Sequence, residues 1–115
     1  RNSNQAIFGV RVVGGKLKNG IELIDENDEK VARVKSIQHE RETVSESGEG
    51  SEVALSLPGI NFERRLKEIR LLYSNISESQ FKNFKKNKDL LSSSELKILQ
   101  EIGEIKRKSK EDWGV

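Results

Sequence analysis

AIFGVRVVGGKLKNGIELIDENDEKVARVKSIQ, residues 6–38, is the stretch that decides the fold. Three runs rich in β-branched and aliphatic residues, 6–13, 21–24 and 30–38, predict three strands. Gly14-Gly15 and Asn19-Gly20 predict a turn after the first run, because Asn-Gly readily adopts positive φ, and the acidic run 25–29 predicts the second turn. Strands this short, with a turn about every eight to twelve residues, favour a small antiparallel β-barrel over a βαβ sheet.

Strand patterns continue beyond this stretch. In the run 30–38 we expect the side chains to alternate, with Val31, Arg33 and Lys35 on one face and Ala32, Val34 and Ser36 on the other. Residues 39–50 are polar and predict an exposed loop, with a short extended piece around Thr43-Val44. Residues 51–57 alternate as a half-buried strand that Pro58-Gly59 ends, 60–66 is ambiguous, and 68–73 is predicted to close the barrel.

Composition narrows the class of protein. The 115 residues are 33% hydrophobic and 35% charged, which allows one modest core under a heavily charged surface. Cysteine is absent and histidine occurs once, so neither a disulfide framework nor a His- or Cys-rich metal site is expected. No apolar run approaches about 18 residues, and we expect no membrane contact. Because methionine is also absent, we expect a piece of a longer protein.

Residues 76–115 change in character and predict two helices. Ser77 to Gln80 and Ser92 to Glu95 are capping-box patterns, so we expect one helix from there to about residue 88 and another from 93 to about 108. Gly103 interrupts the second helix, either as a tolerated surface glycine or at the close approach of another backbone. The basic run 106–110 either complements the helix dipole or forms a binding patch. Trp113 is expected to pin the tail to a helix. The predicted domains are a β-barrel, 1–75, and a helical appendage packed on it, 76–115.

Signatures of catalysis are missing. Residues 9–16 lack the glycine spacing of a phosphate-binding loop, since Val10 stands where glycine is needed and Leu17 where Ser or Thr would hold magnesium. His39 has no nucleophile elbow to serve. We therefore expect no enzyme, no catalytic or metal-binding residue and no cofactor in this chain. The net charge of +2 is weak for a nucleic-acid binder, and its excess lies within 76–115.

Several motifs resemble a known family. Residues 14–20, 34–38 and 52–59 resemble the β-barrel of translational GTPases, which elongation factors share. Residues 101–108, EIGEIKRK, with the terminal Trp113-Gly114-Val115, resemble the C-terminus of the archaeal and eukaryotic initiation factor five-B, the counterpart of bacterial initiation factor two. The likeness covers nearly the whole chain, as the fourth domain of that factor, and it looks archaeal.

This resemblance implies a cytoplasmic, monomeric module that acts at the ribosome during subunit joining. Any GTP and magnesium would belong to a GTPase domain elsewhere in the parent protein. The module would bind the aminoacylated acceptor end of initiator tRNA, with arginines on phosphates, polar side chains on base or ribose edges and valines on the methionyl side chain. Carried over by position, the tRNA-binding residues are Val10, Arg11, Gln38, His39, Arg41, Glu52 and Val53. Glu40 departs from the basic character of bacterial relatives and opposes phosphate.

The resemblance also implies that the helices dock the tail of initiation factor one-A. The residues expected to bind this partner are Phe81, Phe84, Leu99, Ile102, Ile105, Lys106 and Trp113. A simpler interpretation is that two short helices must bury these apolar stripes against the barrel to be stable. The alternative function is a protein-interaction module without RNA contact.

Overall fold

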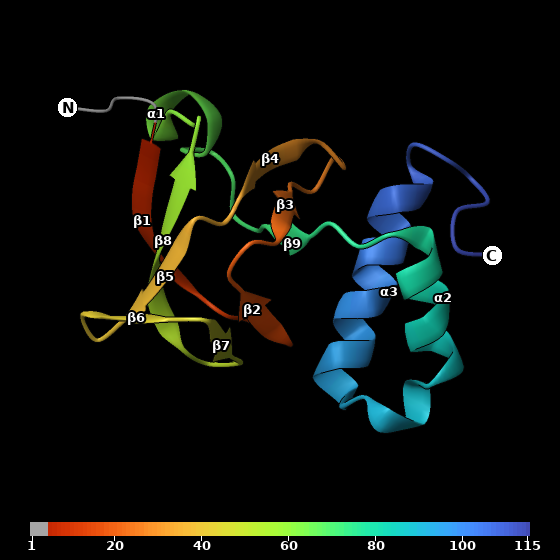
Figure 1. Cartoon of the computed structure of the whole chain (residues 1–115). Helices are drawn as coiled ribbons and strands as arrows, with labels where there is room; N and C mark the ends of the chain where they lie inside the picture. Colours follow the sequence, from red (N-terminus) through yellow and green to blue (C-terminus); the bar gives the residue numbers. More distant parts are fainter. Residues whose placement is uncertain (1–4) are drawn as a thin grey trace.

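The structure is a computed structural model that describes residues 5–115, and its elements follow one another from strands to helices (Figure 1). The strands are β1 (Gln5–Arg11), β2 (Lys16–Lys18), β3 (Glu22–Ile24), β4 (Lys30–Arg33), β5 (Ser36–His39), β6 (Glu42–Val44), β7 (Glu46–Gly48), β8 (Glu52–Pro58) and β9 (Tyr73–Ser74). The helices are α1 (Phe62–Arg65), α2 (Glu78–Lys86), the 3-10 helix η1 (Lys88–Leu90) and α3 (Ser93–Arg107).

The strands form three antiparallel sheets around one hydrophobic core. The sheets are ordered β1-β8-β5-β6, β2-β7 and β4-β3-β9. Ile37 of β5 and Leu57 of β8 are fully buried in this core, and Leu55 is almost so. The predicted fold class, mainly β with antiparallel strands followed by two C-terminal helices, is confirmed.

The run 30–38 is two strands, so the prediction of one continuous strand was wrong. Val34 donates its backbone N–H to the carbonyl of Ile21 at 2.8 Å, whereas the next residue, Lys35, donates to Ser56 at 2.9 Å. The chain therefore leaves one sheet and enters another between these two residues. Val31 and Val34 are both buried. In one regular strand, residues three apart point to opposite faces, so a single strand with one buried face would not bury both.

Two other strand predictions need correction. The short extended piece predicted around Thr43-Val44 is β6, but residues 39–50 also contain β7 and are therefore not otherwise a plain loop. The predicted closing strand 68–73 shrinks to β9, in which only Tyr73 and Ser74 pair with β3. The ambiguous segment before it holds α1, whose N-terminus is capped by the Asn61 side chain. No continuous ladder of backbone hydrogen bonds therefore joins β1 to the segment that precedes β9 in the described chain.

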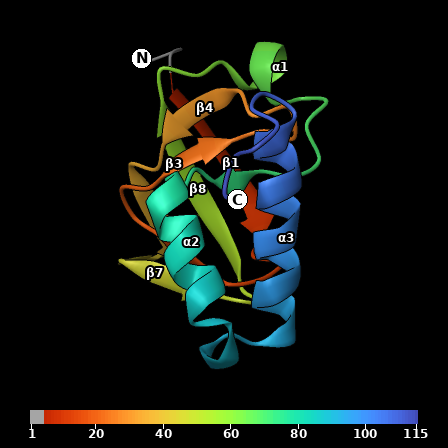
Figure 2. The same ribbon diagram turned by 90° about the vertical axis from the view of Figure 1, so that its right-hand side faces the viewer.

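The two long helices begin where the capping boxes predicted. The hydroxyls of Ser77 and Ser92 each accept a hydrogen bond from the backbone three residues later, and the side chains of Gln80 and Glu95 complete both boxes. Figure 2 shows α2 and α3 side by side. Neither helix, nor any other in residues 5–115, is long and apolar enough to cross a membrane.

Gly103 lies at the contact between these helices. It is buried, and a Cβ atom added to it would be 3.0 Å from Cζ of Phe81. Neither sequence interpretation was right, since the neighbour is an aromatic ring rather than solvent or backbone. The same ring packs against Trp113, with centroids 4.7 Å apart, so Trp113 pins the tail to α2 as predicted.

Polar contacts join α3 to the barrel. Nζ of Lys106 lies 2.9 Å from Oδ1 of Asp28 in the β3–β4 turn, and both side chains are largely buried. The hydroxyl of Tyr73 donates to Oε1 of Glu101 at 3.0 Å. Burial, followed by this hydrogen bond and the Glu101 charge, raises the pKa of Tyr73 to about 12. The position of α3 is therefore set by specific polar pairs as well as by apolar packing.

Candidate nucleic-acid interface

An open groove is lined by residues of the four-stranded sheet. The strands of this sheet lie on the side of the molecule away from α2 and α3 (Figure 1). The volume of the groove is about 600 Å³. Strands β1 and β8 and the hairpin between β5 and β6 build it. The lining residues are Gly9, Val10, Arg11, Gln38, Glu40, Arg41, Glu52, Val53 and Ala54.

The floor of the groove is made of small residues because of the strand register. Gly9 of β1 lies opposite Ala54 of β8, and Ala54 also lies opposite Gln38 of β5. The central part of this row therefore carries no large side chain. Two residues further along β1, on the same face, Arg11 lies opposite Glu52, and both are exposed. A flat floor beside charged side chains lets an extended chain approach the sheet closely.

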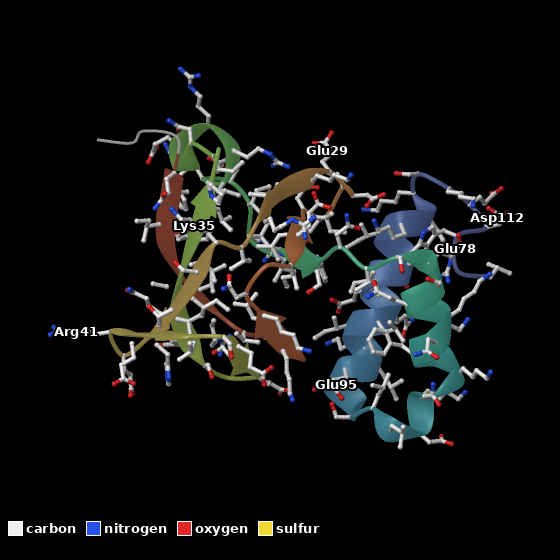
Figure 3. The ribbon with its side chains drawn as sticks, viewed as in Figure 1. Glu29, Lys35, Arg41, Glu78, Glu95 and Asp112 are labelled. Carbon is white, nitrogen blue, oxygen red and sulfur yellow. The ribbon has the colours of Figure 1, made fainter. Side chains whose placement is uncertain are left out.

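The β5–β6 hairpin places Arg41 at the rim of the groove. Its two-residue loop is Glu40-Arg41, flanked by the pair His39 and Glu42. Glu40 has φ of 53° and Arg41 has φ of 72°, which is the left-handed region that such hairpins favour and that glycine or asparagine normally occupies. In Figure 3, Arg41 extends from the tip of this hairpin away from the sheet. Backbone strain of this kind is concentrated at functional sites.

The charges around the groove are mixed. Within residues 5–115, neither Arg11 nor Arg41 forms an ion pair, although Glu40 and Glu52 also line the groove. Both guanidinium groups are exposed and can each bind an oxyanion in a bidentate manner. The groove thus offers separate donors and acceptors rather than one uniformly positive surface.

The structure brings together most of the residues predicted to contact tRNA. Those that line the groove are Val10, Arg11, Gln38, Arg41, Glu52 and Val53. His39 is outside it, because it shares the inward side of β5 with buried Ile37. Val53 is only 5% exposed and belongs to the core, as does half-buried Val10, so these valines support the groove more than they offer an apolar contact.

Sequence reasoning missed Gly9 and Ala54. Their contribution is the absence of a large side chain, and this is visible only once β1 and β8 are paired in register. The signal was present in the alternation of both strands, since Gly9 and Ala54 occupy outward positions in their patterns.

The residues predicted to bind a protein partner do not form one exposed surface. Five of them are buried between the helices and the tail or the barrel: Phe81, Leu99, Ile102, Ile105 and Trp113. Lys106 is held by Asp28, and only Phe84 is substantially exposed, at 40%. The simpler interpretation, packing required for stability, describes this set.

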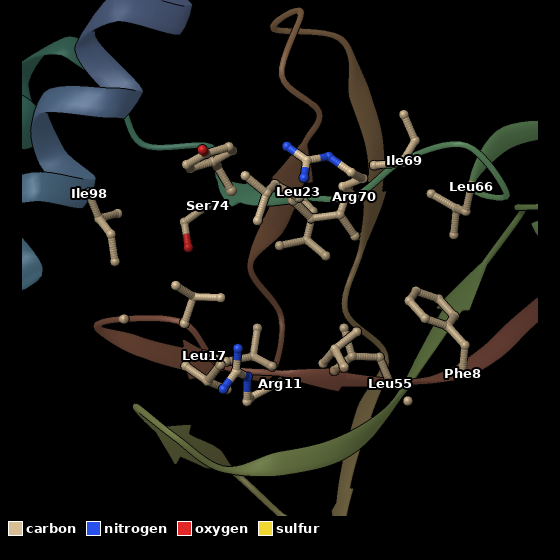
Figure 4. A pocket seen from close by; sticks show the side chains of 18 of the residues that line it. Phe8, Arg11, Leu17, Leu23, Leu55, Leu66, Ile69, Arg70, Ser74 and Ile98 are labelled. Atoms are coloured by element: carbon tan, nitrogen blue, oxygen red, sulfur yellow. The ribbon is translucent and has the colours of Figure 1, made fainter.

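A second cavity, of about 560 Å³, lies on the other side of β1 (Figure 4). It occupies the region where β1 faces residues 66–74 without a hydrogen-bonded ladder, and α3 contributes Ile98 to it. Its walls are mainly apolar: Phe8, Leu17, Leu23, Leu55, Leu66 and Ile69. Arg11 and Arg70 lie on facing sides of this cavity (Figure 4).

Comparisons with known proteins place these features in a family. Residues 1–73 match the family described as elongation factor Tu domain 4. This chain belongs to that family. It is 39% identical over 99% of its length to a protein of Methanoculleus marisnigri and 38% identical over 100% to one of Methanopyrus kandleri. Both are named probable translation initiation factor IF-2, and the chain spans about a fifth of their length, 19% in each case.

A solved structure gives the same result. The crystal structure of GDP-bound aIF5B from Aeropyrum pernix superposes with a TM-score of 0.88 at 33% identity, over 99% of this chain and 19% of that one. The resemblance predicted from the tail and barrel motifs, to the fourth domain of the archaeal and eukaryotic initiation factor, is confirmed. The chain is thus a domain of the translation initiation factor type, with archaeal relatives.

Proposed function

We propose that the chain binds the aminoacylated acceptor end of initiator tRNA in the groove formed by β1, β8 and the β5–β6 hairpin. One observation carries the proposal: Arg11 and Arg41, neither in an ion pair within the described chain, flank a floor of Gly9 and Ala54. Arginines spaced around a flat floor suit the phosphates of an extended single strand. The whole factor's role in ribosomal subunit joining is part of the same proposal.

The carboxylates of the groove suit the aminoacyl group. An amino acid esterified to tRNA carries a free α-ammonium, and Glu52 lies directly across from Arg11 on the neighbouring strand. An exposed carboxylate beside a phosphate-binding arginine can attract the ammonium while the arginine holds the adjacent phosphate. Gln38 can meet a base edge through both its amide donor and its carbonyl acceptor. The groove then distinguishes charged from uncharged tRNA through Glu52.

Fluorescence anisotropy with methionyl initiator tRNA across a salt series tests this function. Arg11→Gln and Arg41→Gln should each weaken binding and reduce the log–log salt slope by about 0.7, the value for one single-strand phosphate contact. Arg64→Gln is the matched control, because Arg64 is exposed on α1 and lines neither cavity. Glu52→Gln should bring the affinities for charged and uncharged tRNA closer together.

Three results would contradict this assignment. The wild-type chain could fail to bind tRNA at low salt while folded, its binding could be insensitive to salt, or Arg64→Gln could weaken binding as much as the groove variants. The last result would indicate a general effect of net charge.

The cavity of Figure 4 supports a second function, which we propose alongside the first: docking of the tail of initiation factor one-A. Its apolar walls lie between β1 and α3, and Arg11, Arg70, Lys16 and Lys67 all contribute to its lining. Such a site suits an extended segment with aliphatic and acidic side chains. Replacing half-buried Ile98 with Asp should abolish chemical-shift changes caused by the tail, whereas Leu90→Asp, at a position 82% exposed, should not. Equal responses of both variants would contradict this docking site.

A further inference from the structure

A basic surface lies on α2 and η1, at the end of the molecule opposite the β5–β6 hairpin (Figure 1). Every residue from 82 to 90 is exposed. This segment contains four lysines, Lys82, Lys85, Lys86 and Lys88, and one acidic residue, Asp89. We call these four lysines the α2 surface. Four lysines against one aspartate give this exposed segment a net charge of +3 (4 − 1).

The positive charge of the α2 surface is largely uncompensated. Lys82 lies 3.8 Å from Glu78 at its nearest, but Lys85, Lys86 and Lys88 form no ion pair with any residue in the described part of the chain. Glu78 is also shared, because it accepts the Gly114 backbone N–H and approaches Lys110. Concentrated charge of one sign destabilises the folded chain through self-repulsion, and a partner of opposite charge relieves this repulsion.

The other basic run of the chain is used internally. Lys106 is paired with Asp28, and Nε of Arg107 donates to the carbonyl of Trp113 at 2.8 Å. Nζ of Lys108 donates to the carbonyl of Glu26 at 3.2 Å. These contacts attach α3 to the barrel and the tail to the helices. The run 106–110 therefore serves the fold. Within residues 5–115, the recorded charge contacts of the α2 surface are only the pairing of Lys82 with Glu78 and the approach of Lys85 to the Phe81 ring, 5.7 Å from its centroid.

The shape of the α2 surface favours a nucleic-acid backbone over a peptide. Neither cavity described above is lined by any residue between 82 and 97, so the lysines lie on a convex helix face. Peptide docking usually needs a groove that buries apolar side chains. Phosphates need only accessible cations, and they release counterions when these bind. The ring of Phe84, which is 40% exposed on the same helix, can add stacking on an unpaired base.

We propose that the α2 surface binds the phosphate backbone of RNA without sequence preference, as a second contact separate from the groove. The principal extents of the molecule are 45 × 28 × 20 Å, and the two surfaces lie toward opposite ends of the long dimension (Figure 1). The two contacts therefore fall on different RNA segments. The proposal does not depend on the groove binding tRNA.

The test uses the full chain and a blunt RNA hairpin that has no single-stranded end. The triple variant Lys85→Gln, Lys86→Gln, Lys88→Gln should reduce the log–log salt slope by about 2 to 3, since each duplex phosphate contact contributes about 0.9. Its affinity at low salt should fall at least tenfold. Glutamine preserves helix propensity, and urea unfolding of both proteins checks that the fold is unchanged.

A matched triple variant keeps the outcome interpretable. Lys18→Gln, Lys30→Gln, Lys35→Gln removes the same charge from exposed barrel lysines, none of which forms an ion pair within residues 5–115. It should change hairpin affinity less than twofold. Equal weakening of hairpin binding by both triple variants, or no weakening by the α2 variant, would overturn the proposal. Polyglutamate serves as a probe for an acidic protein partner, and the proposal is also overturned if the α2 variant loses polyglutamate binding but keeps RNA binding.

Discussion

The Glu40-Arg41 turn leads to a prediction that separates stability from binding. Both residues have positive φ in a two-residue hairpin loop, where Asn-Gly would ordinarily stand. We expect Glu40→Gly and Arg41→Gly each to stabilise the chain. We expect only Arg41→Gly to weaken tRNA binding, because only Arg41 supplies a cation at the rim of the groove.

The magnitude follows from backbone energetics. A residue with a Cβ costs about 1–2 kcal/mol in the left-handed region. Glycine removes this cost but loses about 0.5–1 kcal/mol more conformational entropy on folding. Each substitution should therefore raise the free energy of unfolding by about 0.5–1 kcal/mol, and the double variant by about 1–2 kcal/mol if the two effects add. With a urea dependence of about 2 kcal/mol per molar, the double variant's midpoint rises by about 0.5–1 M.

Urea unfolding followed by circular dichroism measures the stability, and fluorescence anisotropy measures the affinity for methionyl initiator tRNA. Glu40→Gly should bind at least as tightly as the wild type, because it also removes a carboxylate that repels phosphate. Glu40→Gln is the matched control, since it removes the charge and keeps the strained φ. It should tighten binding without stabilising the chain.

Two results would refute this reasoning. If either glycine variant lowers the free energy of unfolding, the positive φ values do not represent strain that glycine relieves. If Arg41→Gly is more stable but binds tRNA as tightly as the wild type, the turn does not retain Arg41 for an RNA contact.

Three further predictions concern the helices and their attachment to the barrel. Trp113→Ala should lower the free energy of unfolding by about 3 kcal/mol, because it removes a buried ring from Phe81, and a change below about 1 kcal/mol in urea unfolding would contradict the packing described. Gly103→Ala should cost about 0–2 kcal/mol, because overpacking against the Phe81 ring (about 1–3 kcal/mol) is partly offset by the better helix propensity of alanine (about 1 kcal/mol), and a rise in the urea midpoint would show that the ring yields freely. Because folding raises the pKa of Tyr73 from 10.0 to about 12, its contribution to stability is intact below pH 10 and is lost as the pH rises toward 12. Tyr73→Phe should remove this loss of stability at high pH. Tyr73 is the chain's only tyrosine, so ultraviolet titration measures its pKa directly, and an ordinary value near 10 would contradict the prediction.

Local signals in the sequence predicted part of the fold well. The two capping boxes mark their helices because each is complete within four residues and needs no tertiary partner. The extended piece around Thr43-Val44 was predicted, but its return to pair with β5 was not, for the opposite reason. Glu40 and Arg41 are not typical two-residue turn formers, so the polar pattern predicts a loop but not a tight reversal that pairs Ile37 with Val44.

The candidate site was predictable by position but not by role. Position follows from the motifs, and the predicted residues on β1, β5 and β8 do meet at one groove. The role of each residue depends on which face of the sheet its side chain occupies and on which residue it pairs with in the neighbouring strand. His39 falls on the inward side of β5, Val53 is held in the core, and Gly9 and Ala54 become important only as a paired row. A shift of one residue in register would have exchanged these assignments.

Whether a basic segment is paired within the fold or left exposed depends on tertiary contacts, which composition does not reveal. Residues 82–88 and 106–110 each hold four Lys or Arg, and both lie at or near the C-terminal end of a helix. The β3–β4 turn lies beside only one of these ends, where Asp28 contacts Lys106 and the carbonyl of Glu26 accepts from Lys108. The acidic turn thus contacts two cations of the segment 106–110, whereas Lys85, Lys86 and Lys88 form no ion pair within residues 5–115. A chain with a net charge of only +2 can in this way present a strongly positive end, and for this reason net charge alone is a poor guide to whether it binds RNA.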